Sequence, residues 1–299
     1  MKLSIIIVNY YVETYLKKCI DSLIDNYESN FKNGEFEIII GDNGSQNHAL
    51  DFVKTYGDYI KLIRNNNNLG YAKANNICIQ SAQGEYVLLL NPDTIVYKNT
   101  LTKLIKYLDE HLKVGLATCR ILLPDGSIDD ASHRGFPTPW RAFTYFSGLG
   151  KMFPNSQFLN GYHLGYQNMN SVHEIEACVG AFMLIRKEVG ESLNWLDEDF
   201  FWYGEDLDFC YRVKKINYQV MYVPSVSILH YKGIASGIKK HSQNIAKADR
   251  KTIILAIKAR YEAMRLFYKK HYLTKYPSIV TNFILLAIWI KEKINFLFI

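Results

Sequence analysis

The stretch YVLLLNPDT, residues 86–94, decides the fold class of this chain. Its first five residues form an uninterrupted apolar run, which is typical of a strand buried on both faces. The run ends at once in a polar turn at residues 91–94. Residues 4–10, SIIIVNY, repeat this form, because a β-branched run there ends on the amide of Asn9. Two buried strands with polar ends predict parallel βαβ units and therefore an α/β fold.

The segments around these strands alternate between helical and extended patterns. We expect helices over residues 14–25, 50–56, 70–82, 101–111 and 206–216. We expect further strands over residues 37–40, 60–63, 115–122, 177–185 and 219–223. Residues 127–174 are rich in Gly, Pro, Asn, Ser and aromatics and lack a clean period. Their composition predicts a long irregular excursion over one face of the sheet, of a kind that is more often functional than idle.

Polar side chains directly follow three of the predicted strands. Asn9 ends the first, Asp42 follows the strand at 37–40, and Asn91 and Asp93 follow the strand at 86–90. Ligands of open α/β sheets bind outside the carboxyl ends of the parallel strands, so these side chains are expected to line one crevice. The sequence contains no G-x-G-x-x-G and no Walker A motif, so a dinucleotide site and a P-loop lose their main support.

The composition limits the class of protein. The 299 residues are 48% hydrophobic and 21% charged, which excludes a disordered chain, a collagen and a polytopic membrane protein. Five scattered cysteines without a C-x-x-C pair indicate a reducing compartment. The apolar N-terminus is interrupted at Asn9, too early for a secretory signal, so we expect the folded body to stay in the cytoplasm.

The net charge of +6 is unevenly distributed along the chain. Residues 1–231 carry 21 basic and 26 acidic side chains, whereas residues 232–275 carry 12 basic and 2 acidic ones. The basic segment has an apolar stripe at helical spacing, made of Ile253, Ile257, Tyr261, Met264 and Tyr268. Basic residues fall on another face, namely Lys247, Lys251, Lys258, Arg265 and Lys269. Such a helix is suited to lie on anionic lipid, although packing on the body or a dimer contact explains the same stripe.

The apolar run at residues 279–290 is 12 residues long and is closed by Lys291-Glu292-Lys293. A helix needs about 20 apolar residues to span a bilayer. We therefore expect an interfacial anchor at this end of the chain rather than a transmembrane helix.

Six stretches of the chain resemble glycosyltransferase family 2 in their order and spacing. They are SIIIVNY (4–10), IIIGDNGS (38–45), NNLGYAKANN (67–76), YVLLLNPDT (86–94), GAFMLIRKEV (180–189) and LDEDFFWYGEDLDFCYRVKKINYQVMYVPSVSILHYKG (196–233). Each stretch alone is a weak signal, but six in register are specific. The LNPDT and GEDLDFC patterns and RGFPTPWRA (134–142) most resemble rhamnosyltransferase-like members of cell-surface polysaccharide assembly.

The resemblance implies one glycosyltransferase-A domain, a Rossmann-like nucleotide-diphospho-sugar transferase fold with a mostly parallel central sheet, plus C-terminal amphipathic helices. Residues 1–233 would form this catalytic domain, with a nucleotide half at about 1–126 and an acceptor half at about 127–233. Residues 234–299 would form a basic amphipathic helical region.

By the same resemblance, Asp42 is the carboxylate that recognises the base of the donor, although an Asx-turn explains it as well. Asp93 matches the metal ligand of the family's D-x-D motif, and His230 matches the histidine that returns to the metal, an Mg²⁺ or Mn²⁺ ion. The first acidic position of that motif is Asn91 here, a departure that puts binding by two carboxylates in doubt. The expected donor-binding residues are Asn9, Asp42, Gly70, Asn76, Asn91, Gly180 and Ala181.

The family resemblance makes Asp206 the base that deprotonates the acceptor hydroxyl, with Glu205 beside it and Trp202 on the acceptor. Ordinary capping of the first turn of a helix is the alternative explanation for these carboxylates.

The expected function is inverting, metal-dependent transfer of rhamnose from dTDP-rhamnose to a glycan or polyprenyl-linked acceptor, on the inner face of the cell membrane. A UDP-hexose donor, such as UDP-galactose or UDP-glucose, and a non-catalytic sugar-nucleotide or glycan-binding subunit are the alternatives. No nucleic-acid partner is expected, and a homodimer is possible.

Overall fold

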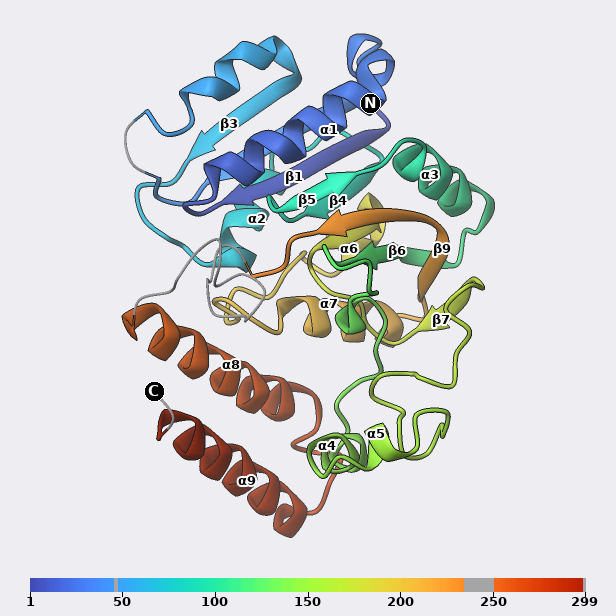
Figure 1. The fold of residues 1–299 in the computed structure, drawn as a ribbon, viewed down its shortest axis with the longest axis vertical. Coiled ribbons are helices and arrows are strands. Elements are labelled where there is room, and N and C mark those ends of the chain that lie inside the picture. Colours follow the sequence, from blue (N-terminus) through green and yellow to red (C-terminus); the bar gives the residue numbers. More distant parts are fainter. Residues whose placement is uncertain (46–47, 234–249, 298–299) are drawn as a thin grey trace.

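The computed structural model describes residues 1–45, 48–233 and 250–297. The expected domain boundary at residue 234 and the tail residue Lys247 lie outside these ranges. The described strands form a nine-stranded sheet in the order β3-β2-β1-β4-β8-β6-β9-β5, with β7 paired to β9 (Figure 1). The strands are β1 (Leu3–Asn9), β2 (Phe36–Asp42), β3 (Ile60–Arg64), β4 (Tyr86–Leu90), β5 (Thr94–Val96), β6 (Val114–Leu122), β7 (His173–Ile175), β8 (Phe182–Arg186) and β9 (Gln219–His230).

The central sheet is mostly parallel, as predicted. β1 pairs in parallel with β2 and β4, β2 with β3, and β6 with β9, and no antiparallel register is longer than any of these. The antiparallel β8 lies between β4 and β6 and joins the two parallel groups. In the register, Asn9 is opposite Asp42 and Ile7 is opposite Leu90. The carboxyl ends of β1, β2 and β4 are therefore level, which the proposed crevice requires.

Helices cover both faces of the sheet, because the central strands are apolar on both sides. Leu3, Ile5 and Ile7 of β1 join the core under α1 (Glu13–Lys32) and α3 (Thr100–Glu110). Ile6 points to the opposite core, under α2 (Tyr71–Ile79), α6 (Lys187–Ser192) and α7 (Glu205–Lys215). This alternation explains why the strands at 4–9 and 86–90 read as continuous apolar runs.

The second half of the sheet departs from the predictions. The strand expected at 177–185 covers only 182–186, because residue 177 instead forms an isolated bridge with residue 134. The strand expected at 219–223 continues to His230 past an irregularity in its pairing with β6. This extension places His230 opposite Thr94 of β5, a strand that the sequence did not predict.

Other boundaries also differ. The first helix extends to Lys32, residues 51–59 form a 3₁₀ helix, and β7 was not predicted. The excursion at 127–174 is not wholly irregular, since it contains a short 3₁₀ turn (Asp130–Ser132), α4 (Pro139–Phe146) and α5 (Leu149–Met152). Thr138 caps α4 and Pro139 opens it, a start signal hidden by the many aromatics around it.

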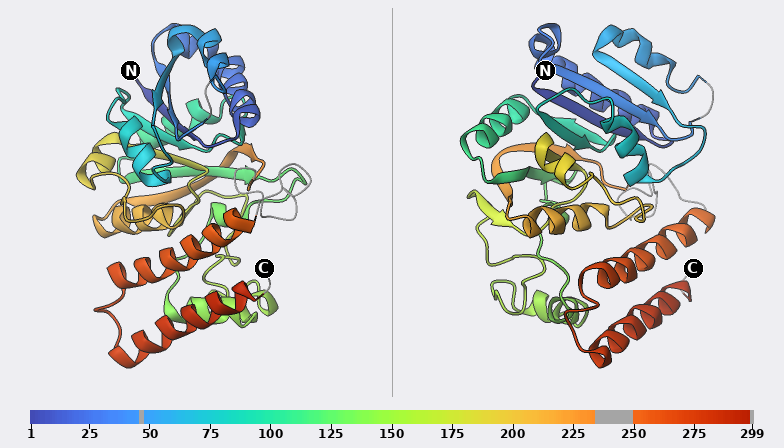
Figure 2. Two further views of the ribbon diagram at one scale, coloured as in Figure 1. Left: turned by 90° about the vertical axis from the view of Figure 1, so that its left-hand side faces the viewer. Right: turned by 180° about the vertical axis from the view of Figure 1, so that it is seen from behind.

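The C-terminal helices α8 (Arg250–His271) and α9 (Ser278–Phe296) form a pair at the end of the molecule away from β3 (Figure 2). α8 packs on α7. The ring of Tyr211 contacts Phe267 there, and Nε2 of His271 lies 2.7 Å from the accepting Oδ1 of Asp208. The prediction that the stripe of α8 faces lipid is wrong for Tyr261 and Tyr268, which are buried in the protein. No helix within the described residues is long and apolar enough to cross a membrane.

Candidate active site

The end of β2 is folded around the carboxylate of Asp42. Asp42 accepts a hydrogen bond from the backbone N–H of Ser45 at 2.9 Å and an ion-paired bond from Arg64 at 3.2 Å. Asn9 donates from Nδ2 to the hydroxyl of Ser45 at 2.9 Å, so both strand ends hold the same turn. The buried Oδ1 of Asn9 has no hydrogen-bond partner among the described residues. A buried acceptor without a partner is costly, so this atom is available to a ligand donor.

A second cluster joins the ends of β4 and β9. Nε2 of His230 lies 3.3 Å from Oδ1 of Asp93 and 3.5 Å from Nδ2 of Asn91. On the far side of the ring, Nδ1 lies 3.6 Å from Oδ2 of Asp129, which also pairs with Lys232. Burial opposes the charged imidazole, but the carboxylates of Asp93 and Asp129 outweigh it and raise the pKa of His230 to about 9.

This second cluster suits a divalent cation that takes most of its ligands from elsewhere. A carboxylate oxygen and an imidazole nitrogen are ligands that Mn²⁺ accepts, and a carboxylate behind the ring is the usual support of a ligating histidine. Within the described residues, no three His, Cys, Asp or Glu side chains gather as a complete metal cluster. Asp93 and His230 therefore suit two coordination positions of such a cation, whose other ligands would be oxygens of a diphosphate.

Residues 180–181 connect this cluster to the start of α7. The carbonyl of Ala181 accepts the N–H of Asn91 at 3.1 Å, and the N–H of Gly180 donates to Oδ2 of Asp206 at 3.1 Å. The carbonyl of Gly180 accepts the hydroxyl of Tyr71 at 2.9 Å. Gly180 and Ala181, which are predicted to bind the nucleotide-sugar donor, thus lie between the cluster of the predicted metal ligands and the predicted base, Asp206.

Asp206 is held by three donors at the N-terminus of α7. Besides Gly180, the N–H of Leu207 donates to Oδ1 at 2.6 Å, and Arg134 forms an ion pair with Oδ2 at 2.7 Å. Burial opposes the charge of the Arg134 guanidinium, but the adjacent carboxylate of Asp206 raises its pKa. The carboxylate of Asp206 is therefore fixed in position within a positively polarised setting.

Glu205 has the opposite environment although it is the next residue. Its side chain is buried, and Oε2 has no hydrogen-bond partner in the part of the chain that the structure describes. Burial, and then the negative charge of Asp206, raise the pKa of Glu205 to about 8. Two adjacent carboxyl groups in environments this different are suited to different roles.

Three predicted site residues are engaged around the segment that precedes α7. Gly70 has a φ of +81°, and a Cβ there would stand 2.5 Å from the carbonyl oxygen of Phe201. Asn76 donates to the carbonyl of Leu196 at 2.8 Å and accepts its N–H at 3.1 Å. The ring of Trp202 stacks parallel to that of Tyr203, with centroids 5.6 Å apart. These contacts show that Gly70 and Asn76 help to pack the segment before α7. Their roles in binding the nucleotide-sugar donor remain predictions.

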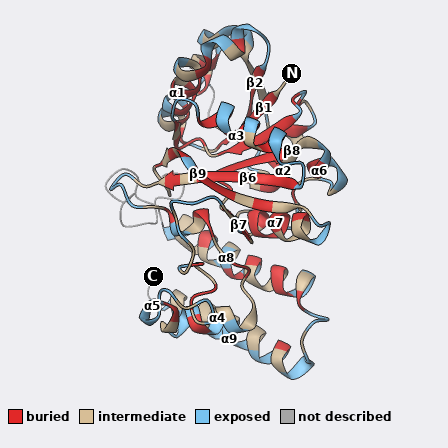
Figure 3. Cartoon of the chain, turned by 90° about the vertical axis from the view of Figure 1, so that its right-hand side faces the viewer, coloured by how far each residue is buried: buried red, intermediate tan, exposed pale blue. Residues whose placement is uncertain are grey.

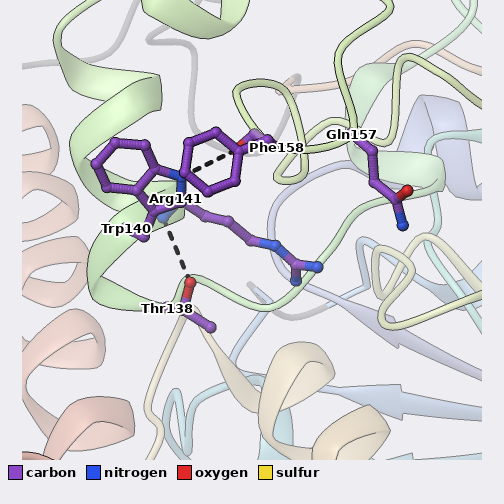
Figure 4. Close-up of a pocket in the computed structure, with 5 residues that line it drawn as sticks. All are labelled: Thr138, Trp140, Arg141, Gln157 and Phe158. Atoms are coloured by element: carbon purple, nitrogen blue, oxygen red, sulfur yellow. Dashed lines mark hydrogen bonds between the residues drawn. The ribbon is translucent and has the colours of Figure 1, made fainter.

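A separate hollow lies over α4 (Figure 4). It is lined by Thr138, Trp140, Arg141, Gln157 and Phe158. The indole N–H of Trp140 donates to the carbonyl of Phe158 at 2.9 Å, which fixes one wall. None of the strand-end residues lines this hollow, so it is distinct from the cluster around Asp93 and Asp206.

Two residues of the site carried no predicted role. Arg134 lies in the quoted RGFPTPWRA stretch, but its partner Asp206 is 72 positions away, and no periodic signal links them. Asp129 follows β6 after the turn at residues 124–126, so the strand-end rule that identified Asp42 applies to it as well.

The comparisons with known proteins agree with this geometry. The model of the family "Glycosyl transferase family 2" matches residues 4–193. The chain therefore belongs to glycosyl transferase family 2 and is a glycosyltransferase with the glycosyltransferase-A fold.

Two relatives illustrate the similarity. The chain is 28% identical over 236 residues to rhamnosyltransferase WbbL of Escherichia coli K12, covering 76% of this chain and 82% of that protein. It is 25% identical over 211 residues to the N-acetylglucosaminyl-diphospho-decaprenol L-rhamnosyltransferase of Mycobacterium tuberculosis, covering 67% of this chain and 68% of that protein.

Among solved structures, the chain resembles the mannosyltransferase PcManGT of Pyrobaculum calidifontis in complex with GDP-Man and Mn²⁺. The TM-score is 0.56 at 15% identity, over 98% of this chain and 86% of that one. It also resembles Staphylococcus aureus TarS 1-349 in complex with UDP-GlcNAc, with a TM-score of 0.56 at 19% identity, over 89% of this chain and 65% of that one. At identities of 15% and 19%, this similarity shows a shared fold alone.

Proposed function

We propose that this glycosyltransferase moves rhamnose from dTDP-rhamnose, with inversion, to a glycan or polyprenyl-linked acceptor of cell-surface polysaccharide biosynthesis. The observation that carries the proposal is the hydrogen-bonded path from Asp206 through Gly180 and Ala181 to Asn91 and His230. Such a path would fix the proposed base and the proposed diphosphate site relative to each other, on either side of residues 180–181, as a direct displacement requires. The similarity to two rhamnosyltransferases supports the choice of sugar.

The nucleotide of the donor would bind at the ends of β1 and β2. Asp42 makes two hydrogen bonds, and an ionised carboxylate has room for about four. It can therefore accept a base N–H without releasing the turn, while Oδ1 of Asn9 accepts a second donor. This assignment makes residues 1–126 the nucleotide half and residues 127–233 the acceptor half, with 234–299 as a separate basic region.

Asp93 and His230 would hold a divalent cation, Mg²⁺ or Mn²⁺, against the diphosphate. When bound, the cation offsets the negative charge that the nucleotide carries away as it leaves. The similarly folded mannosyltransferase PcManGT, solved with GDP-Man and Mn²⁺, supports this proposed requirement. The acidic balance of residues 1–231 supports it too, because the body itself offers the diphosphate no net positive charge.

Asp206 would remove the proton from the acceptor hydroxyl as its oxygen attacks the anomeric carbon. The new C–O bond forms on the face opposite the leaving nucleotide, and the proton passes to the carboxylate of Asp206. With its pKa raised to about 8, Glu205 would be mostly protonated at neutral pH and would have to lose its own proton before it could accept this one. Arg134 would act as a positioning residue, and Trp202 would contact the acceptor.

A donor screen tests the proposal. Thermal unfolding is measured with dTDP-rhamnose, UDP-glucose, UDP-galactose and UDP-GlcNAc, each with and without Mn²⁺, followed by assay of nucleotide release. We expect the largest metal-linked stabilisation and turnover with dTDP-rhamnose. A response to a UDP-hexose alone would replace the donor, binding without release would favour a non-catalytic subunit, and no response to any donor would overturn the proposal.

A further inference from the structure

α9 exposes a continuous row of large apolar side chains. They recur every three or four residues along the helix, at Ile279, Phe283, Leu286, Ile290, Ile294 and Leu297. Phe283 is 71% exposed and Leu297 is 81% exposed, and Trp289 stands beside the row at 51%. Figure 3 shows α9 at the outer end of the molecule, with pale blue segments along its length. We call this row, with Trp289, the α9 face.

The orientation of the α9 face is fixed by the other side of the helix. There, Thr281 shares a hydrogen bond with Tyr268 of α8 at 3.0 Å, and Glu292 accepts from Arg265 at 2.7 Å. Asn295 donates to Tyr261. Because α8 is itself fixed on α7 through His271 and Asp208, the apolar row cannot turn inward without breaking these contacts. The exposure is therefore a property of the packed helix pair.

The charges around the α9 face are positive. Lys293 lies 5.8 Å from the ring of Trp289, and Lys291 lies 4.2 Å above the ring of Phe146 on α4. The acidic residue of α9, Glu292, is engaged by Arg265 on the buried side. Phe146 and Phe143 of α4 are themselves about half exposed, so the apolar surface continues beyond α9. An apolar row with a cationic end and an interfacial tryptophan complements a lipid surface that carries negative charge.

We propose that the α9 face docks on a bilayer that contains anionic phospholipid, with the helix lying flat in the interface. The apolar row would enter the boundary between headgroups and acyl chains, and Lys291 and Lys293 would contact phosphate groups. This interaction goes beyond the proposed sugar transfer and does not depend on the identity of the donor. It keeps the interfacial anchor expected at residues 279–290 and assigns the contact to the exposed side of α9 rather than to the stripe of α8, whose Tyr261 and Tyr268 are buried.

A second copy of the chain fits the α9 face less well. A twofold dimer brings the same patch of both subunits together, so the lysines of one α9 would lie near those of the other. The helix offers no exposed carboxylate to compensate them, because Glu292 is half-buried and paired. Charge complementarity therefore favours lipid phosphate over self-association.

The experiment is co-sedimentation of the full chain with vesicles of phosphatidylcholine, with and without phosphatidylglycerol. Wild type is expected to pellet with the anionic vesicles, less with neutral ones, and less at high salt. The double variant Phe283→Gln/Leu286→Gln is expected to lose binding at least about tenfold, since two large side chains no longer enter the interface. Lys291→Gln/Lys293→Gln is expected to lower binding to anionic vesicles only.

The matched control is Leu112→Gln. Leu112 is 74% exposed, close to the 71% of Phe283, but lies in the turn between α3 and β6. This variant is expected to pellet like wild type. Wild type that stays in the supernatant with every vesicle, or a Phe283→Gln/Leu286→Gln variant that still pellets, would overturn the proposal. Light scattering that shows a dimer which the same variant dissociates would assign the face to a second copy and also overturn it.

Discussion

The strand ends and α9 both depart from the usual pattern of apolar side chains inside and charged side chains outside. The first region buries charged side chains, and the second exposes apolar ones. At the strand ends, Asp42, Asp93 and His230 are buried among apolar elements, and so is Glu205 at the adjacent start of α7. On α9, large apolar side chains such as Phe283 face solvent. Both arrangements cost free energy in the isolated chain, so each points to something that the chain meets. The buried carboxyl groups suit a compact, charged ligand, whereas the α9 face suits an extended, apolar one.

The two regions also differ in how their side chains are fixed. Asp206 is held by an arginine and two backbone N–H groups, a geometry that a one-atom change disturbs. The α9 face is positioned by three hydrogen bonds on its far side, while the apolar side chains themselves contact little. Substitutions at the strand ends should therefore affect catalysis or folding, and substitutions on the α9 face should affect neither.

The largest effect is expected from Asp206→Asn. The amide cannot accept the proton of the acceptor, so turnover should fall about 10³-fold, the usual range for a lost general base. Donor affinity, followed by the shift in thermal unfolding with dTDP and Mn²⁺, should stay within a few fold of wild type. If donor affinity falls as much as turnover, Asp206 holds the site together rather than acting as the base.

Arg134→Gln should have the next largest effect. It leaves Asp206 buried without its cation, which costs about 3 kcal/mol of unfolding free energy for a pair of this kind. Urea unfolding measures the loss. Arg134→Lys restores the charge but not the planar fork, so it should recover part of the stability. Equal losses for the two variants would show that packing of the guanidinium, and not its charge interaction with Asp206, contributes the free energy of unfolding.

Glu205→Gln should change the pH dependence of stability. The pKa of Glu205 is about 8 in the folded chain, against 4.5 for a free side chain. Between these values the folded state binds more protons than the unfolded state, so wild-type stability falls as pH rises from about 4.5 to about 8. The neutral glutamine removes this fall, so the variant should be more stable than wild type above pH 8, by on the order of 2 kcal/mol. Parallel unfolding curves for both proteins at pH 6 and 9 would contradict a buried, neutral Glu205.

The strand ends were predictable from the sequence because their signals are local. An apolar run that ends in NPD, or in GDN, identifies a strand and its carboxyl end within ten residues. The proximity of His230 to Asp93 came only from the family resemblance, since it depends on the unpredicted β5. The Arg134–Asp206 pair could not be predicted, because it joins a segment without a period to a helix start 72 residues later.

The C-terminal segments were predicted as helices, but the lipid-facing stripe proposed for α8 is wrong at Tyr261 and Tyr268, and no face was assigned to α9. α9 is apolar nearly all round between residues 279 and 290, so periodicity does not say which side is buried. The buried side of α9 is set by Thr281, Glu292 and Asn295, which form hydrogen bonds with residues of α8. For α8, the aromatic members of the stripe are buried against α9, where Tyr261 accepts from Asn295 and Tyr268 shares a hydrogen bond with Thr281.

The smallest effect on stability is expected from Phe283→Ala, with Phe267→Ala as its matched control. The two substitutions remove the same atoms, but Phe283 is 71% exposed and Phe267 is 3% exposed. Phe283→Ala should change the free energy of unfolding by less than about 0.5 kcal/mol, as a surface substitution does. Phe267→Ala opens a cavity between α8 and α7 and should cost about 3 kcal/mol or more. Urea unfolding of both variants without lipid gives the two values. Similar losses would mean that Phe283 is covered in solution, and the α9 face would then be part of the packed protein rather than a surface for another partner.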